Sequence, residues 1–190
     1  MEAHIHSPHC DHAHGHPKPA GLLWRWLMTL FFICFVFFAV RPLIAKQLLN
    51  RGSSYMTYEL YDDAIRTYRK AIWFDKNNSR AWEMLGFCYG SKGDLENALR
   101  VYQDAIKINP KNISALFGVG ATLMDERRVR EAVPYLERVR ALGSDASGAT
   151  AKNVAMYYES SLRLLLICYE APKEFDKKKG VQEELRRFKP

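Results

Sequence analysis

The side chains best suited to chemistry in this 190-residue chain lie in its first 16 residues. All six histidines of the sequence are there, and His12, His14 and His16 alternate, so an extended chain would carry them on one side. Imidazole nitrogen and thiolate sulfur are ligands that suit Zn²⁺, Cu²⁺ and Ni²⁺. The candidate metal ligands are therefore His4, His6, His9, Cys10, His12, His14 and His16. A solvated polar tail with a biased composition is the alternative interpretation.

The rest of the chain offers little for catalysis. No histidine follows His16, so neither acid–base catalysis by histidine nor metal ligation by histidine is open to it. The sequence shows no Gly-rich phosphate loop, nucleophile–base pair or C-x-x-C motif. We therefore expect no enzyme activity, and no cofactor unless Zn²⁺, Cu²⁺ or Ni²⁺ binds the tail.

The composition is that of a folded protein with a basic balance. Hydrophobic residues make up 48% and charged residues 26%, which excludes global disorder, although residues 1–21 are polar, turn-rich and predicted to be disordered. The formal net charge of +7 is compatible with nucleic acid binding. Acidic residues are interleaved in the basic clusters, however, so we expect a solvated face or contact with anionic lipid headgroups, and no nucleic acid partner.

Residues 22–40 form an apolar run whose polar members are Arg25 and Thr29. As a helix the run spans roughly 28 Å, close to the ~30 Å hydrocarbon core of a bilayer. Trp24 and Trp26 suit the headgroup interface at its entry end. A buried core helix and a cleaved signal peptide are the alternatives, but no small-residue cleavage site follows. We interpret residues 22–42 as an uncleaved transmembrane signal anchor that ends at Arg41 and Pro42, with a short linker before the next element.

A period of 34 residues runs through residues 43–146. Five columns keep this spacing over three copies: Ala64, Ala98 and Ala132; Gly52, Gly86 and Gly120; Tyr68, Tyr102 and Leu136; Ala71, Ala105 and Val139; Tyr55, Tyr89 and Leu123. Each copy is predicted to hold two amphipathic helices, with the small residues where the helices cross. A single helical pair cannot bury its apolar face, so the copies must stack.

In these residues the chain resembles the tetratricopeptide repeat (TPR) family. The middle copy fits the family pattern best, with Trp82, Leu85, Gly86, Tyr89, Gly93, Ala98, Tyr102, Ala105 and Pro110. The first copy has Leu48 for the tryptophan and Lys76 for the proline, and the third has Leu116 and Ser144. The resemblance covers just over half of the chain and implies a fold and a style of binding, not a reaction.

The expected fold class is all-α, a TPR helical-hairpin solenoid with an N-terminal transmembrane helix and a C-terminal capping helix. The predicted segments are a His-rich tail (1–21), the anchor (22–42), three repeats within 43–146 (45–78, 79–112 and 113–146), a degenerate fourth repeat or capping helix (147–172) and a charged C-terminal segment (173–190). A helix is expected over residues 149–170, where Tyr158, Leu162 and Leu165 recur at helical spacing.

The resemblance also implies a concave groove lined by the first helix of each pair. The implied partner-binding residues are Arg80, Glu83, Phe87, Ser114, Phe117, Ala121 and Met124. The carboxylate clamp of some family members is absent, because Leu49, Ser53, Met84, Ser114 and Gly118 occupy its positions. We expect Phe87, Phe117 and Met124 to anchor an apolar partner helix. The alternative is that residues 149–170 of the chain itself fill the groove.

These observations predict a membrane-anchored TPR adaptor or scaffold that holds partner proteins at a membrane, in assembly or as an accessory subunit of a membrane protein complex. The expected partners are proteins, membrane proteins above all, and the lipid bilayer. A metal-handling membrane protein that uses the His-rich tail is the alternative. The slight excess of Arg41, Lys46 and Arg51 over Lys18 and Arg25 favours the cytoplasmic side for the repeats.

Overall fold

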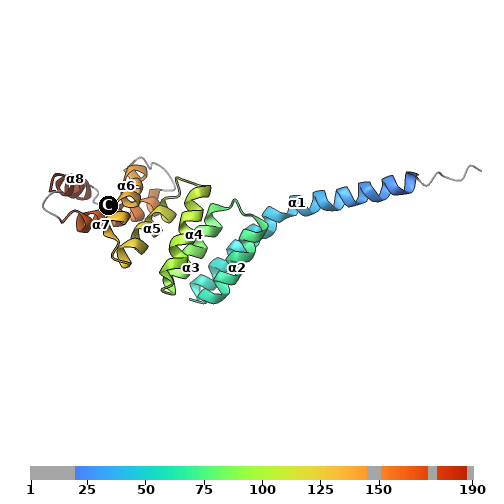
Figure 1. The fold of residues 1–190 in the computed structure, drawn as a ribbon, viewed down its shortest axis with the longest axis horizontal. Coiled ribbons are helices and arrows are strands. Elements are labelled where there is room, and N and C mark those ends of the chain that lie inside the picture. Colours follow the sequence, from blue (N-terminus) through green and yellow to red (C-terminus); the bar gives the residue numbers. More distant parts are fainter. Residues whose placement is uncertain (1–19, 145–150, 171–174, 188–190) are drawn as a thin grey trace, which may run out of the picture. The chain divides into compact units, whose positions relative to one another are not determined.

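The computed structural model describes residues 20–144, 151–170 and 175–187. Over these ranges the regular structure is entirely helical (Figure 1). The chain divides into two compact units, residues 1–40 and 41–190. The predicted metal ligands between His4 and His16 lie outside the described residues.

Helix α1 covers Ala20–Thr57 and includes the whole apolar run. Its apolar part is long enough to cross a membrane and has a mean hydropathy of 2.3, with none of that stretch buried. The expectation that the helix ends at Arg41 and Pro42 is wrong, because the helix continues through Pro42 without a linker. A proline inside a helix removes one backbone hydrogen bond. Packing just beyond it compensates, since Ala45 is 1% exposed.

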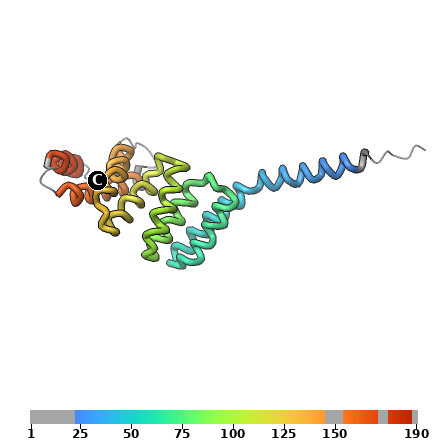
Figure 2. Tube along the Cα trace, viewed as in Figure 1, coloured from blue at the N-terminus to red at the C-terminus, as the bar shows by residue number. Residues whose placement is uncertain are grey.

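The unit that begins at Arg41 consists of antiparallel helices stacked side by side (Figures 1 and 2). After α1, its helices are α2 (Tyr61–Phe74), α3 (Ser79–Ser91), α4 (Leu95–Ile108), α5 (Ile113–Asp125), α6 (Val129–Ser144), α7 (Ala151–Cys168) and α8 (Phe175–Arg187). The fold is thus the all-helical TPR-type solenoid that the 34-residue period predicts. The exact repeat boundaries stay a prediction.

Side-chain caps begin several of these helices. Asn78 and Asn112 each accept a hydrogen bond from the backbone N–H three residues on, at 3.2 Å and 3.0 Å. Asp94 caps α4 in the same way, at 3.2 Å from the Asn97 nitrogen. An N-cap satisfies one of the unpaired donors of the first turn and contributes about 1 kcal/mol. The polar residues between the apolar stretches therefore fix where each helix starts.

The core forms where glycine and alanine let neighbouring helices approach. A Cβ built on Gly86 would lie 2.8 Å from Cδ1 of Tyr102, and one on Gly52 would lie 2.5 Å from Cε1 of Tyr68. Ala64, Ala98 and Ala132 are fully buried. The prediction that the small residues lie at the helix crossings is confirmed.

Helices α7 and α8 close the stack after α6. The predicted helix over 149–170 is confirmed as α7, which buries Tyr158, Leu162 and Leu165. Helix α8 buries Val181 completely, and its Glu184 accepts hydrogen bonds from Arg140 Nε, at 2.6 Å, and from the Tyr158 hydroxyl. A partly buried polar network thus ties the last helix to α6 and α7.

Candidate partner-binding groove

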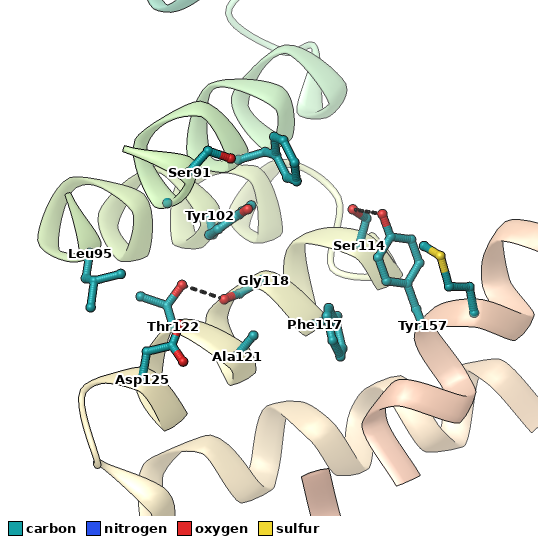
Figure 3. A pocket seen from close by; sticks show the side chains of 13 residues that line it. Ser91, Leu95, Tyr102, Ser114, Phe117, Gly118, Ala121, Thr122, Asp125 and Tyr157 are labelled. Carbon is teal, nitrogen blue, oxygen red and sulfur yellow. Dashed lines mark hydrogen bonds between the residues drawn. The ribbon is translucent and has the colours of Figure 1, made fainter. Parts of the chain in front are cut away.

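The groove in the repeat unit has a volume of about 450 Å³ and lies between α3, α5 and α7 (Figure 3). Helices α3 and α5 are the first helices of their pairs, and they contribute Phe87 and Phe117. Helix α7 contributes Met156 and Tyr157. The lining is mostly apolar and aromatic, which suits apolar side chains of a partner.

Contacts between α5 and α7 set the shape of the groove. The rings of Phe117 and Tyr157 have centroids 5.4 Å apart at an interplanar angle of 46°. Ser114 Oγ donates a hydrogen bond to the Tyr157 hydroxyl at 3.0 Å (Figure 3). The edge formed by Tyr157 is therefore held by one polar and one aromatic contact.

Tyr102 of α4 also lines the groove, beside Gly118 (Figure 3). A Cβ on Gly118 would lie 2.6 Å from Cζ of the Tyr102 ring. Burial, with a smaller contribution from the Glu83 carboxylate, raises the pKa of the Tyr102 hydroxyl. The ring therefore stays neutral at physiological pH and presents an uncharged surface.

The predicted partner-binding residues separate into three groups. Phe87, Ser114, Phe117 and Ala121 line the groove together, and Phe87 is 45% exposed. Arg80 and Glu83 lie in an adjoining hollow of about 360 Å³ that Ser114 and Tyr157 share. Met124 lines neither space.

Two of these residues are engaged inside the protein. Glu83 is 5% exposed, and Asn112 Nδ2 donates a hydrogen bond to its Oε2 at 3.0 Å. Met124 packs toward α7, where the Cys168 thiol lies 3.5 Å from its sulfur. The prediction that Met124 faces the groove as an anchor is wrong, because α7 covers that side chain.

Helix α7 does not fill the groove, although it forms one of its walls. Met156 is 56% exposed, and the open volume remains beside Phe87 and Ala121. Sequence reasoning missed Met156 and Tyr157, because the helical period over 149–170 indicates its buried face and not the face toward the groove. The adjacent insertion breaks the 34-residue period, so no column pointed to them.

The absence of a carboxylate clamp has a packing reason at two positions. Ser114 is engaged by Tyr157, and Gly118 leaves no space for a longer side chain beside Tyr102. The described part of the chain holds no group of three or more histidine, cysteine or acidic side chains that could bind a metal ion. A metal site on the tail stays a prediction.

Comparison with known proteins supports the TPR interpretation. Residues 89–125 match the model of the TPR repeat family. Protein bimA of Emericella nidulans is 37% identical over 71 residues, which are 37% of this chain and 9% of that protein. Human superkiller complex protein 3 is 29% identical over 91 residues, which are 48% of this chain and 6% of that protein. The chain thus spans less than a tenth of the length of either relative.

Solved structures show the same fold. The crystal structure of MamA superimposes with a TM-score of 0.62 at 18% identity, covering 76% of this chain and 77% of that one. The TPR2B domain of yeast Sti1, in a complex with pHsp70, gives 0.56 at 16% identity, covering 64% and 98%. The first TPR of Spaghetti (RPAP3), bound to the HSP90 peptide SRMEEVD, gives 0.54 at 23%, covering 60% and 93%. The repeat unit is therefore a TPR solenoid, a fold that binds protein partners in these complexes.

Proposed function

We propose that this protein is a membrane-anchored TPR adaptor that holds a partner protein at a membrane, as an assembly factor or as an accessory subunit of a membrane protein complex. The observation that carries the proposal is the apolar groove between α3, α5 and α7, with Phe87 45% exposed at its rim. An exposed aromatic side chain beside a preformed groove is suited to an amphipathic helix of a partner. No catalytic step is assigned to the groove.

Phe87 and Phe117 are the proposed anchors of the partner. Buried aromatic anchors commonly contribute more than about 2 kcal/mol each to an interface, which is roughly 30-fold in affinity. We expect the Phe87→Ala and Phe117→Ala double variant to lose the partners that co-purify with the full chain from solubilised membranes. The readouts are quantitative mass spectrometry of the co-purified proteins and the circular dichroism of the variant.

A matched control is a double variant that removes two exposed apolar side chains outside the groove. Leu60 and Ile167 are 48% and 55% exposed, and neither lines the groove. Leu60→Ala with Ile167→Ala should leave co-purification unchanged. Retention of partners by the groove variant, with its helical content intact, would place the binding surface elsewhere. Loss of helical content would instead show that the two phenylalanines serve the packing of α7.

The anchor is the apolar part of α1. Its length and hydropathy support a single transmembrane span. Washing membranes with alkaline carbonate should therefore leave the protein in the pellet. Release into the supernatant would contradict the anchor and leave the groove unaffected.

The cytoplasmic side is proposed for the repeats, on the charge bias around the run. Arg41 and Lys46 follow the span, while Arg25 lies near its other end. In sealed vesicles that expose their cytoplasmic face, added protease should degrade the repeats. Protection of the repeats in such vesicles would reverse the orientation.

A further inference from the structure

The C-terminal end of α2 carries a large aromatic side chain that the groove does not use. Trp73 is 59% exposed and packs edge-to-face on Phe74, with ring centroids 4.8 Å apart. Tryptophan is the side chain most typical of the boundary between lipid headgroups and acyl chains, because its ring is apolar and its N–H can still be hydrated. Its exposure here therefore raises the question of what it contacts.

Arg41 ties Trp73 to the end of the apolar run. The Arg41 guanidinium donates a hydrogen bond to the Trp73 carbonyl at 3.0 Å, and its carbon lies 5.9 Å from the centroid of the Trp73 ring. Both residues belong to the same compact unit. Arg41 also directly follows Val40, the last residue of the apolar run. Trp73 consequently lies within one side-chain length of the point where the chain leaves the run.

The residues around this point have the composition of a lipid-facing surface. Leu43 is 63% exposed. Lys46, Lys70 and Lys76 are also exposed, and the half-buried Asp75 is the acidic residue among them, accepting a hydrogen bond from the Asn77 backbone at 3.1 Å. Cations beside an exposed tryptophan and leucine are suited to phosphate groups above an acyl boundary.

We propose that Trp73 and Leu43 form a second membrane contact, in which the Trp73 ring enters the headgroup–acyl boundary and Arg41, Lys46, Lys70 and Lys76 face lipid phosphates. The proposal rests on the membrane anchoring proposed above, because the bilayer brings lipid to Arg41 only if residues 22–40 span it. The occupant of this surface is the bilayer itself. The first helical hairpin would then rest on the membrane instead of hanging from a flexible connection.

Tryptophan fluorescence in the full chain tests this contact. The triple variant Trp24→Phe, Trp26→Phe and Trp82→Phe leaves Trp73 as its sole tryptophan. It is reconstituted into vesicles of phosphatidylcholine and phosphatidylglycerol, with bromine carried either near the glycerol or near the chain end of the lipid. We expect a blue-shifted emission and severalfold stronger quenching by the shallow bromine than in the control.

The control carries its tryptophan at the opposite end of α2. Tyr58 is 75% exposed, and the 14 residues of α2 place it about 20 Å from the Trp73 end of the helix. Replacing all four native tryptophans by phenylalanine and adding Tyr58→Trp gives the same number of fluorophores. Its emission should be that of a water-exposed indole, with little quenching by either lipid.

Trp82 donates a hydrogen bond to the Lys76 carbonyl at 2.9 Å, so its loss could disturb the fold. A second pair avoids this change: Trp24→Phe with Trp26→Phe, compared with and without Trp73→Phe. The difference between their quenching curves isolates Trp73 while Trp82 is kept. Circular dichroism of each variant checks that the helical content is the same.

The outcomes separate the two proposals. Quenching of native Trp24 and Trp26 without quenching of Trp73 overturns the second contact and leaves the anchor standing. Absence of quenching at every tryptophan overturns both. A blue shift of Trp73 that disappears when the protein is diluted in lipid means that a second copy covers the surface, which also overturns the lipid contact.

Discussion

The ring of Tyr102 lies between two glycines of different helices, and this contact fixes how closely α3, α4 and α5 approach. A Cβ at Gly86 would lie 2.8 Å from Tyr102 Cδ1, and one at Gly118 would lie 2.6 Å from Tyr102 Cζ. Side chains do not approach so closely without displacement, and Tyr102 is only 7% exposed. The two glycines are therefore required by packing at these positions.

Gly118→Ala should destabilise the repeat unit by about 1–3 kcal/mol, because the ring must shift in a filled core. Gly180→Ala is the matched control, since a Cβ there meets nothing within 4 Å. Alanine is the better helix former, so that change should be neutral or stabilising by up to about 1 kcal/mol. Chemical denaturation followed by circular dichroism measures both. Equal stabilities would contradict the proposed role of the Tyr102 contact.

Cys88 lies in the other half of the core and is fully buried. Burial raises the pKa of its thiol from 9.0 to about 12. Because the thiolate is the reactive species, a shift of this size lowers its fraction at pH 8 by on the order of 1000-fold. In a variant with Cys10, Cys34 and Cys168 replaced by serine, maleimide should label Cys88 only after denaturant is added. Rapid labelling under native conditions would show that the core opens locally.

At the scale of elements, the same backbone conformation recurs in the three turns between paired helices. Glu59, Gly93 and Arg127 have φ values of 58°, 79° and 60°, and they are 34 residues apart in sequence. Only glycine adopts this left-handed region without a steric cost of about 1–2 kcal/mol. The period thus records a turn geometry as well as a packing pattern, and two of the three turns carry strain.

These turns make a prediction in both directions. Gly93→Ala should lower the free energy of unfolding by roughly 1–2 kcal/mol, because it introduces the strain that the other two turns already carry. Arg127→Gly should raise it by less than about 1 kcal/mol, since the relief is offset by the greater entropy of glycine in the unfolded chain. Thermal melts of the two variants and the parent provide the measurement. A stabilising Gly93→Ala change would contradict the assigned turn geometry.

The sequence predicts the helices better than it predicts the groove, for a physical reason. Gly86 and Tyr102 belong to columns of the period, so their contact follows from the spacing. Glu83 is buried because Asn112, on a different repeat, bonds to it, and Met124 is covered because α7 packs beside it. Contacts between repeats and with the last helices depend on the stacking geometry, which a column of residue types does not record.

At the scale of the whole molecule, one helix joins the apolar run to the first repeat. The sequence suggested a break at Pro42, since proline in a helix interior costs about 3 kcal/mol in isolation. The helix instead continues to Thr57, where Gly52 packs on Tyr68 and Arg41 bonds to the Trp73 carbonyl. Tertiary packing here outweighs the local preference. The chain therefore enters the solenoid with no flexible linker after residue 40.

The apolar run offers a test of whether the bilayer holds this molecule. Phe31 and Phe35 are 68% and 62% exposed on α1 and lie near the middle of the run. Arginine at the centre of a span costs about 3 kcal/mol on insertion scales, so Phe31→Arg with Phe35→Arg should lose about 6 kcal/mol of insertion free energy. We expect the carbonate-resistant fraction of the protein to fall sharply in this variant.

The matched control adds two arginines outside the run. Tyr58 and Leu60 are 75% and 48% exposed in the turn before α2, so Tyr58→Arg with Leu60→Arg changes the net charge equally without placing charge in the hydrocarbon. That variant should remain in the carbonate-washed pellet. If both variants behave alike, retention would come from surface charge or from a bound partner, and the exposed apolar face of α1 would have to be covered by protein. If only the variant within the run is released, lipid is what covers that face.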